Sequence, residues 1–316
     1  MHALLVQQPS LFDGLAATVE LDAPLGGLTW FKVGGCADAL VTPKTTDALS
    51  TLVTRCHETG TPLRVLGSGA NLLVADEGVD GVVVRLDAPC FQTVEFDRDG
   101  PAPVRAWAGA DLMKLVQECA RRGLDGLSQL AGIPASVGGA ITMNAGGAFG
   151  DTAQAVSSVG MLTHSGVRSD ISAAEAGFSY RHTNLPRGIV LWADLALMSG
   201  DRETIRARVK EIFAYKSRSQ PMADRSAGCM FRNPVEASTG LRTSAGRLID
   251  EAKLKGFSCG GAYVSPVHGN FIALREGGSA TDVLAVAAEV QLRVLERTGV
   301  RLEREVVVWS RRGELP

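Results

Sequence analysis

The sequence predicts an α+β protein built from two or three domains. Its 316 residues are more than one hydrophobic core of ordinary size accommodates. Segments with helical periodicity and short β-branched runs follow one another without the strict alternation of a doubly wound parallel sheet. Glycine-rich stretches are concentrated in the first half of the chain. These observations favour mixed helix-and-sheet domains that carry ligand-binding loops.

Four segments show the apolar spacing of amphipathic helices. They cover residues 47–58, 111–122, 203–218 and 281–297. In the first of them, Thr46 is a candidate N-cap and Gly60 a candidate stop. Gly123 and Gly299 follow the second and the last segment in the same way. We therefore expect four main helices, of which the third is basic.

Short runs rich in β-branched residues separate these helices and predict strands. They lie at residues 63–66, 82–86, 104–107, 156–162, 189–197, 270–274 and 306–309. Composition changes at the polar loop 87–103 and at the basic segment 216–226, which favours domain boundaries there. The expected domains are residues 1–86 joined by a C-terminal strand at 301–316, residues 87–214, and residues 215–300.

Composition also excludes several classes of protein. The net charge of −2 and the isoelectric point near 6.2 argue against a nucleic-acid partner, which usually requires a basic surface. The N-terminus has neither a basic lead nor a long apolar run, so we expect no signal peptide and no membrane partner. The six cysteines are scattered without a Cys-x-x-Cys pair, which disfavours a zinc site and a disulfide framework. A cytoplasmic protein is expected.

Three glycine-rich segments, at residues 29–38, 65–81 and 131–151, are candidate ligand-binding loops. Glycine lets the backbone approach an anion closely, because no Cβ intervenes. The run from Gly67 to Asn71 directly follows a predicted strand and could form a nest for a pyrophosphate. Tight turns are the alternative interpretation of each segment taken alone. A Rossmann fingerprint does not fit, since the third glycine is absent at the required spacing.

Two of these segments resemble those of a known family. The strings VLGSGANLLVADEGVDG at 65–81 and GIPASVGGAITMNAGGAFGD at 132–151 are similar to the FAD-binding stretches of the MurB family, the UDP-N-acetylenolpyruvoylglucosamine reductases. The resemblance extends from about Thr29 to Val307. It implies an FAD-binding fold of the vanillyl-alcohol-oxidase (PCMH) type in two subdomains, followed by a C-terminal α+β substrate-binding domain.

The resemblance also implies the ligands. FAD would bind non-covalently, and NADPH would be the co-substrate. The substrate would be UDP-N-acetylglucosamine enolpyruvate, which would be reduced to UDP-N-acetylmuramate in peptidoglycan precursor synthesis. The implied cofactor-binding residues are Gly67, Ser68, Gly69, Ala70, Asn71, Leu72, Gly132, Ile133, Pro134, Ser136, Val137, Gly138, Gly139, Asn144, Ala145 and Gly146.

Arginine and glutamate candidates for catalysis lie far apart in the sequence. Arg181 ends the string FSYR, and its planar guanidinium suits a carboxylate, although most arginines lie on the surface. The resemblance makes Arg181 catalytic. In the string LEREV, Glu303 and Glu305 would share one face of a strand, or would simply be charged groups in water. The resemblance singles out Glu305, which precedes Val306.

Cys229 is the third catalytic candidate. It lies in the string SAGCMFRNP, where the resembled family commonly has a serine that donates a proton. A thiol releases a proton more readily than an alcohol, so the replacement suits the same chemistry. A lone cysteine is more often a small buried hydrophobe, which is the alternative interpretation. The neighbouring glycine and Asn233 favour the functional role.

The three candidates suit one reaction. Hydride from the reduced flavin would add to C3 of the enolpyruvyl group, and Cys229 would deliver a proton to C2. Arg181 and Glu305 would stabilise the enolate that develops between these steps. NADPH would then reduce the flavin again.

A substrate site is expected mainly in the last third of the chain. Lys255, Lys216 and Arg218 are candidate phosphate partners. His268 and Asn270 would lie beside the ligand, although a lone histidine is as often structural, and no second residue at metal spacing supports a metal site. The residues implied as substrate-binding are Tyr180, Asn233, Lys255, His268, Asn270, Lys216 and Arg218.

The family usually has His-Ala-Asn where this chain has His268-Gly269-Asn270, a small departure. The chain resembles the shorter subgroup, which lacks an inserted tyrosine loop, and a monomer is expected. Two alternatives remain open from the sequence. One is an oxidase of the same fold, which would tether FAD through His or Cys. The other is a flavin- or nucleotide-binding module without catalytic activity.

Overall fold

The structure is a computed structural model that describes residues 11–100, 102–236, 240–311 and 313–315. The chain divides into two compact units, each with its own hydrophobic core. The first unit comprises residues 1–22, 38–68 and 81–216, and the second comprises residues 23–37, 69–80 and 217–316. The α+β class expected from the sequence is confirmed, because both units combine helices with sheets. The three-part division expected from the sequence stays a prediction.

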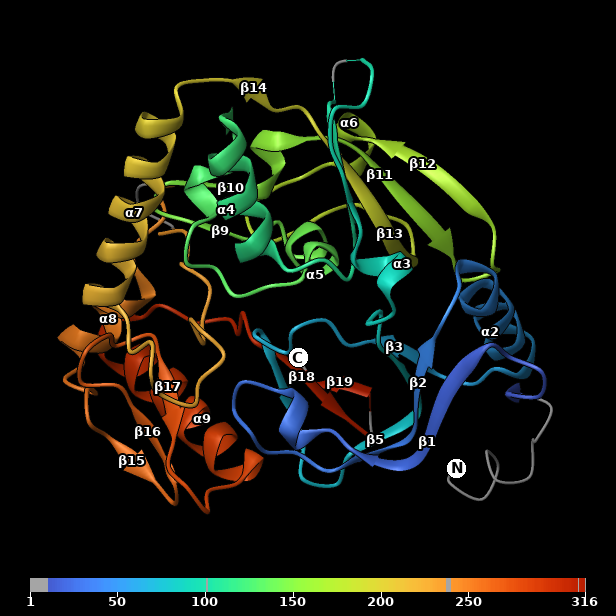
Figure 1. Cartoon of the computed structure of the whole chain (residues 1–316). Helices are drawn as coiled ribbons and strands as arrows, with labels where there is room; N and C mark the ends of the chain where they lie inside the picture. The colour runs from blue at the N-terminus through green and yellow to red at the C-terminus, as the bar shows by residue number, and fades with distance from the viewer. Residues whose placement is uncertain (1–10, 101, 237–239, 312, 316) are drawn as a thin grey trace. The chain divides into compact units, whose positions relative to one another are not determined.

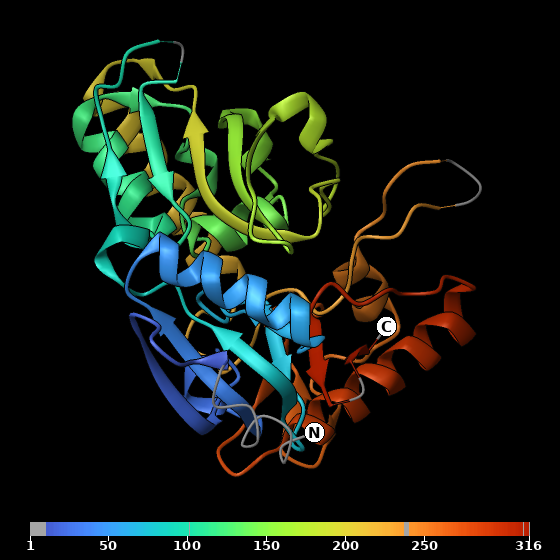
Figure 2. The same ribbon diagram turned by 90° about the vertical axis from the view of Figure 1, so that its right-hand side faces the viewer.

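A four-stranded sheet in the order β1-β2-β5-β3 begins the first unit. Its strands are β1 (Ala17–Pro24), β2 (Cys36–Pro43), β3 (Leu63–Val65) and β5 (Val79–Val84). Helix α2 (Thr46–Thr59) lies against this sheet in Figure 2, and Leu49, Leu52 and Val53 bury its apolar face. Its N-cap is Thr45 rather than the expected Thr46, and it ends at Gly60, whose φ of 66° suits glycine.

A five-stranded antiparallel sheet in the order β12-β11-β13-β7-β6 forms the rest of the first unit, with α5 packed against β13 (Figure 1). Its strands are β6 (Val94–Glu95), β7 (Val104–Trp107), β11 (Val156–Thr163), β12 (Arg168–Ser172) and β13 (Gly188–Leu195). The helices are α3 (Pro89–Gln92), α4 (Leu112–Arg122), α5 (Val137–Thr142), α6 (Ala173–Ala176) and α7 (Arg202–Ser219). Short elements connect them: β8 (Leu124–Asp125), η3 (Ser128–Leu130), β9 (Gly146–Gly147), β10 (Gly150–Asp151), η4 (Thr152–Ala155) and β14 (Met198–Ser199).

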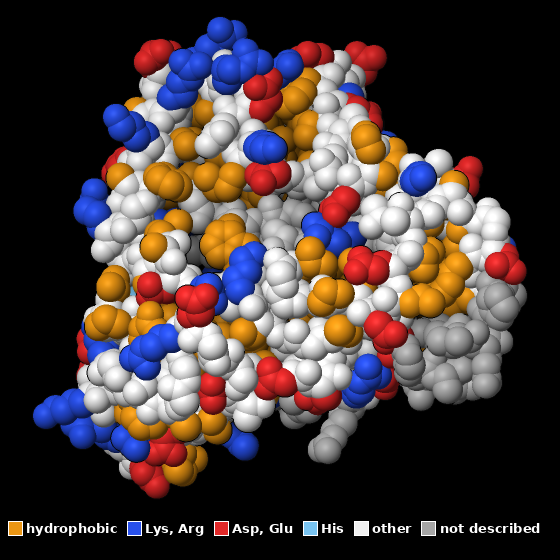
Figure 3. Space-filling view, turned by 60° about the horizontal axis from the view of Figure 1, so that its bottom comes forward, with side chains coloured by type: hydrophobic (Ala, Val, Ile, Leu, Met, Phe, Trp, Pro, Cys, Tyr) orange, Lys and Arg blue, Asp and Glu red, His pale blue; other side chains and the backbone are white. Residues whose placement is uncertain are grey.

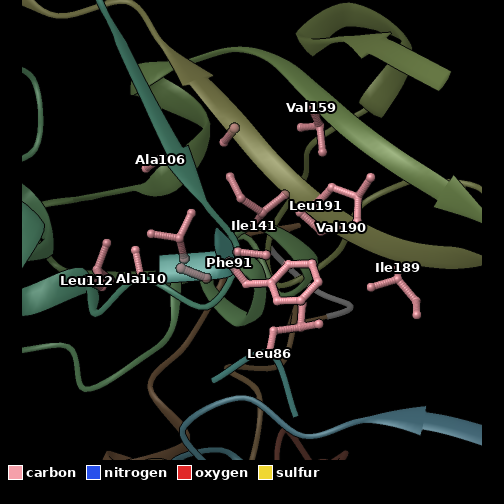
Figure 4. Packing of buried hydrophobic residues seen from close by; sticks show 14 of the residues in the cluster. Leu86, Phe91, Ala106, Ala110, Leu112, Ile141, Val159, Ile189, Val190 and Leu191 are labelled. Carbon is pink, nitrogen blue, oxygen red and sulfur yellow. The ribbon is translucent and has the colours of Figure 1, made fainter. Parts of the chain in front are cut away.

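The core of the first unit is aliphatic around one aromatic ring. Phe91 of α3 is fully buried and points toward Val190 and Leu191 of β13 in Figure 4. Ile141 of α5 lies in the same cluster, so the glycine-rich segment 131–151 is anchored to the sheet by its apolar residues. Truncation of a buried phenylalanine to alanine costs about 3–5 kcal/mol. This core therefore fixes the loop that carries many of the cofactor-binding candidates.

The described part of the second unit contains two small sheets, two α-helices and one short 3-10 helix. The sheet β19-β18-β4 contains β4 (Leu72–Val74), β18 (Val307–Ser310) and β19 (Gly313–Leu315), and β18 runs parallel to β4. The antiparallel sheet β15-β16-β17 contains β15 (Ser258–Cys259), β16 (Ala262–Val264) and β17 (Ile272–Leu274). The helical elements are η2 (Gly26–Leu28), α8 (Ala245–Glu251) and α9 (Ala280–Thr298).

Helix α9 is hydrogen-bonded at its N-terminus to one of the glycine-rich segments. Its N-cap Ser279 and Asp282 form a capping box. Asp76, which lies in the segment 65–81, accepts hydrogen bonds from the backbone N–H groups of Ala280 and Thr281, both at 2.9 Å. Because these donors lie at a helix N-terminus, the Asp76 carboxylate is stabilised there and its pKa is lowered by hydrogen bonds that outweigh the opposing effect of burial.

Helices in the described part of the chain are all too short or too polar to cross a bilayer. On the face shown in Figure 3, acidic and basic side chains are interspersed. This mixture is in keeping with the near-neutral formal charge of −2.

Candidate active site

The first part of the site is the turn that carries Arg181. Asn144 is 1% exposed, and its Nδ2 donates to the carbonyl oxygen of Ser179 at 2.9 Å. Its Oδ1 accepts from the N–H of Ala153 at 3.0 Å, so one amide ties the turn to the glycine-rich segment. Arg181 has a φ of 56°, and its Nη2 donates to the carbonyl oxygen of Gly146 at 2.7 Å. The structure thus brings Arg181 to the predicted cofactor-binding segment within the first unit.

Close packing explains the glycine at position 67 of the same unit. A Cβ at Gly67 would lie 2.5 Å from the Oγ of Ser136, so the two predicted cofactor-binding segments meet where one has no side chain. Ser68 Oγ donates to the carbonyl oxygen of Pro134 at 3.4 Å. The N–H groups of Val137 and Gly138 donate to the carbonyl oxygens at positions 110 and 108. These two N–H groups therefore hold the loop in place, and their hydrogen bonds are made to protein carbonyl oxygens.

The predicted loop continues into the second unit from Gly69 onward. Gly69 has a φ of 67°, and a Cβ there would collide with the carbonyl oxygen of Leu28. Asn71 Nδ2 donates to the carbonyl oxygen of Glu305 at 3.1 Å, and Val307 N–H donates to the carbonyl oxygen of Asn71 at 3.1 Å. The loop is thereby joined to the residues that lead into β18.

Cys229 and Glu305 lie in neighbouring segments of the second unit. The N–H of Glu305 donates to the carbonyl oxygen of Met230 at 2.8 Å, and Cys229 forms a backbone bridge with Phe271. Both Cys229 and Glu305 are partly exposed, whereas Glu303 is exposed. The expected strand face shared by Glu303 and Glu305 is not found, because β18 begins only at Val307.

Asn270 holds the segment that carries Cys229. It is 2% exposed, and its Oδ1 accepts from the N–H of Phe231 at 2.9 Å. Its Nδ2 donates to the carbonyl oxygen of Phe231 at 2.7 Å, and the N–H of Met230 donates to the Asn270 carbonyl oxygen at 2.7 Å. The Asn270 side chain thus forms a pair of hydrogen bonds with the Phe231 backbone, as the backbone of a neighbouring strand would. Its expected contact with substrate stays a prediction.

The remaining substrate candidates of the second unit have defined surroundings. His268 Nδ1 accepts from the N–H of Asn270 at 3.2 Å, and burial followed by the positive charge of Lys255 lowers the pKa of His268. Lys255 Nζ lies 2.9 Å from Asp250 Oδ2, and Asn233 Oδ1 accepts from the N–H that follows the N-cap of α8. Arg218 is exposed.

Tyr180 and Lys216 are the candidates that lie in the first unit. The guanidinium of Arg181 lies 5.1 Å from the centre of the Tyr180 ring. Lys216 is 4% exposed, and its Nζ donates to the carbonyl oxygen of Ala131 at 2.6 Å. This burial leaves little of the Lys216 side chain accessible to a phosphate.

Two contributions to the site escape inspection of the sequence. Asp76 was part of a glycine-rich string, but its role at the start of α9 depends on a partner about 200 residues away. Asn270 was expected to bind substrate, whereas both groups of its amide bond to Phe231. The capping box of Ser279 and Asp282 indicates the start of α9, but it does not indicate Asp76 as a partner. No local signal indicates the second.

Comparison with known proteins identifies the family. The model of an FAD binding domain matches residues 37–172, and the model of the UDP-N-acetylenolpyruvoylglucosamine reductase C-terminal domain matches residues 220–309. The reductase of Desulfosudis oleivorans is 40% identical over 300 residues, which are 92% of this chain and 94% of that protein. The chain belongs to the UDP-N-acetylenolpyruvoylglucosamine reductase family.

Further relatives agree with this assignment. The reductase of Heliobacterium modesticaldum is 40% identical and covers 90% of this chain and 88% of that protein. The crystal structure of the Thermus caldophilus enzyme has a TM-score of 0.77 at 41% identity, and covers 94% of this chain and 100% of that one. The chain is therefore an FAD-dependent oxidoreductase of peptidoglycan precursor synthesis with the expected FAD-binding fold, and NADPH is the co-substrate of its family.

Arg181 belongs to the first unit, and Cys229 and Glu305 belong to the second. The backbone of Glu305 bonds to that of Met230, which directly follows Cys229, and the convergence of the three side chains stays a prediction. The assignment of individual cofactor-binding and substrate-binding residues also stays a prediction.

Proposed function

We propose that this chain reduces UDP-N-acetylglucosamine enolpyruvate to UDP-N-acetylmuramate, with NADPH as electron donor and non-covalently bound FAD as carrier. Family membership supports this substrate class. The observation that supports the residue assignment is the 2.8 Å hydrogen bond from Glu305 N–H to the carbonyl oxygen of Met230, because Met230 directly follows Cys229 and Glu305 lies far away in the sequence. We also propose a cytoplasmic monomer.

The residues present fit an FAD site. A Cβ at Gly67 would lie 2.5 Å from Ser136 Oγ, and one at Gly146 would lie 2.5 Å from Asp151 Cβ, so the chain packs closely at both positions because they have no side chain. We propose that the sixteen cofactor-binding residues implied by the resemblance hold FAD. The chemistry that bound FAD supplies is hydride transfer, from NADPH and on to C3 of the enolpyruvyl group.

Arg181 and Glu305 have the roles of stabilising groups in this proposal. Hydride addition at C3 leaves negative charge at C2, which is delocalised into the substrate carboxylate. A fixed positive charge and a hydrogen-bond donor beside that carboxylate lower the barrier. The bonds from Asn144 to Ser179 and from Arg181 to Gly146 hold the guanidinium in place. Glu305, when protonated, supplies the donor.

Cys229 completes the reaction by delivering a proton to C2. A thiol loses its proton more readily than the serine hydroxyl that is common at this position in the family. The Cys229 segment is held in place through Met230 and Phe231, which both bond to Asn270. For the UDP-sugar we propose contacts from Tyr180, Asn233, Lys255, His268, Asn270 and Arg218, with an indirect role for Lys216.

Substitution of Cys229 separates the two halves of the reaction. In Cys229→Ala, NADPH should still bleach the flavin at the wild-type rate, because that step needs no proton from the thiol. Reoxidation by the enolpyruvyl substrate should slow by about 100-fold or more, within the range typical of a lost general acid. Stopped-flow absorbance measures both steps on one sample.

Cys229→Ser is the matched control. It should keep appreciable turnover, because a hydroxyl can serve as donor, and it should lose sensitivity to thiol alkylation. Full turnover of Cys229→Ala would remove Cys229 from the mechanism. Alkylation of Cys229→Ser that still inactivates would assign the sensitivity to another of the six cysteines.

The mode of FAD binding separates this function from that of an oxidase of the same fold. We expect the yellow colour to leave the polypeptide on denaturation and to remain in the filtrate. Colour that stays with the chain, or NADPH oxidation that does not depend on the enolpyruvyl substrate, would contradict the proposed function.

A further inference from the structure

An aromatic contact joins the hairpin β9–β10 to helix α7 within the first unit (Figure 1). From Gly146 to Asp151 the hairpin reads GGAFGD, so Phe149 is its one large apolar side chain. The ring of Phe149 packs edge to face on the ring of Tyr215 from α7, with 5.2 Å between the ring centres and 86° between the planes. Side-chain packing of this hairpin therefore depends on Phe149.

The same hairpin holds the guanidinium of Arg181. Arg181 Nη2 donates to the carbonyl oxygen of Gly146 at 2.7 Å. Gly146 pairs with Asp151 across the hairpin, and Gly147 pairs with Gly150, whose φ is 134°. A hairpin with three glycines has little stiffness of its own, because glycine has the greatest backbone freedom. The position of the Gly146 carbonyl oxygen thus depends on how the tip of the hairpin is held.

The exposure of Tyr215 indicates orientation more than stability. Its side chain is 46% exposed, so it contributes less buried apolar area than a core aromatic residue. Edge-to-face contact nevertheless favours one relative orientation of two rings. The next residue, Lys216, donates from Nζ to the carbonyl oxygen of Ala131 at 2.6 Å. The end of α7 therefore contacts the glycine-rich segment 131–151 at its start and again at its hairpin.

We propose that Tyr215 is a positioning residue for the reaction. Through Phe149 and the hairpin, its ring fixes the Gly146 carbonyl oxygen and thereby the orientation of Arg181. This inference rests on the proposed function, in which Arg181 stabilises the negative charge that develops after hydride addition at C3. A displaced guanidinium stabilises that charge less, because such stabilisation requires a fixed geometry.

Tyr215→Leu tests this role, because it removes the ring but keeps an apolar side chain. Anaerobic stopped-flow absorbance separates the two half-reactions. We expect reoxidation of the reduced flavin by saturating enolpyruvyl substrate to slow about tenfold. Reduction of the flavin by NADPH should change less than about twofold, because that step forms no enolate. FAD content and melting temperature should match the wild type, as for most exposed positions.

Three variants serve as controls. Tyr215→Phe keeps the ring and should reoxidise within about twofold of the wild-type rate. Phe213→Leu removes a ring of 45% exposure from the same end of α7, where Phe213 lies beside the turn at Gly132. Lys210→Met changes an exposed position of the same helix. Both of these variants should match the wild type in the two half-reactions.

Double-mutant cycles test the order of the contacts. Phe149→Leu should slow reoxidation by a factor similar to that of Tyr215→Leu, and the double variant should be no slower than the slower single variant. In an Arg181→Ala enzyme, which reoxidises slowly already, adding Tyr215→Leu should cause no further loss. Residues that act independently would instead multiply their effects.

Several results would overturn the proposal. These are wild-type reoxidation in Tyr215→Leu, an equal loss in Tyr215→Phe, and a further loss in the Arg181→Ala background. Loss of FAD, or equal slowing of both half-reactions, would also overturn it, because these effects indicate a structural role. If Tyr215→Leu does not fold, Phe149→Leu is judged by the same criteria. Wild-type reduced flavin that the enolpyruvyl substrate fails to reoxidise would instead refute the proposed function.

Discussion

Two buried asparagines hold the two parts of the candidate site in different ways. Asn144 joins separate points of the first unit, with one hydrogen bond to Ser179 and one from Ala153. Asn270 forms two hydrogen bonds to one residue, Phe231, and its own backbone bonds to Met230. The first arrangement fixes the orientation of a turn, whereas the second extends a backbone network. Loss of the first should therefore impair catalysis more than stability, and loss of the second should do the opposite.

The largest effect is expected from Asn270→Leu. This change leaves the N–H and the carbonyl oxygen of Phe231 without their present partners, in a segment whose Phe231 side chain is 1% exposed. Each unsatisfied buried group costs about 1–3 kcal/mol, so the free energy of unfolding should fall by about 3 kcal/mol. Urea unfolding followed by circular dichroism measures it.

Asn184→Leu is the control, because Asn184 is exposed and bonds to the exposed His182. It should change the free energy of unfolding by less than about 1 kcal/mol. If the free energy of unfolding falls no more in Asn270→Leu than in this control, the hydrogen bonds of Asn270 do not stabilise the fold.

A smaller loss of stability but a clearer loss of activity is expected from Asn144→Gly. Glycine is the appropriate replacement, because Asn144 has a φ of 40° and glycine adopts this region without strain. Without the bond to Ser179 the Arg181 turn loosens, and kcat/KM should fall about tenfold or more. The free energy of unfolding should fall by about 1–2 kcal/mol.

Hydrogen exchange tests the cause of that loss. The N–H of Ser179 and the N–H of His182, which bond across the turn, should exchange faster in Asn144→Gly. Unchanged exchange with unchanged kcat/KM would contradict the comparison between the two asparagines. A stability loss equal to that of Asn270→Leu would contradict it as well.

The sequence predicted those elements that have strong local signals. All four amphipathic helices occur, and Gly60, Gly123 and Gly299 end three of them as expected. Strands β1 and β2 were not predicted. The alternation of apolar and polar residues from Ala17 to Ala23 was a usable signal for β1, and the glycine-rich segment 29–38 overlapped only the first residues of β2. Helix α5 was missed since two of its six residues are glycines, which have low helix propensity.

For the site, the residue types could be predicted but their bonding could not. The resemblance indicated Asn144 and Asn270 as ligand-binding residues, yet which atoms they bond depends on segments far away in the sequence. Lys216 lies in a basic helix, where a charged side chain is ordinarily expected in water. Its burial follows from packing on Gly132, which no helical periodicity reveals.

The smallest effect concerns His268, whose pKa is lowered chiefly by burial and secondarily by Lys255. In Lys255→Met the pKa of His268 should rise, but by less than burial lowers it, because the larger cause remains. Proton NMR titration of the His268 ring measures the change, with Lys210→Met as the control.

An unfolded histidine titrates near 6.5, so the wild type loses stability as the pH falls from that value toward the lower pKa of folded His268. The variant should lose less stability over this range, and an unchanged pKa would show that Lys255 does not act on the histidine. In both regions burial is the larger cause of the lowered pKa and a cationic neighbour adds to it, Arg181 at Lys216 and Lys255 at His268.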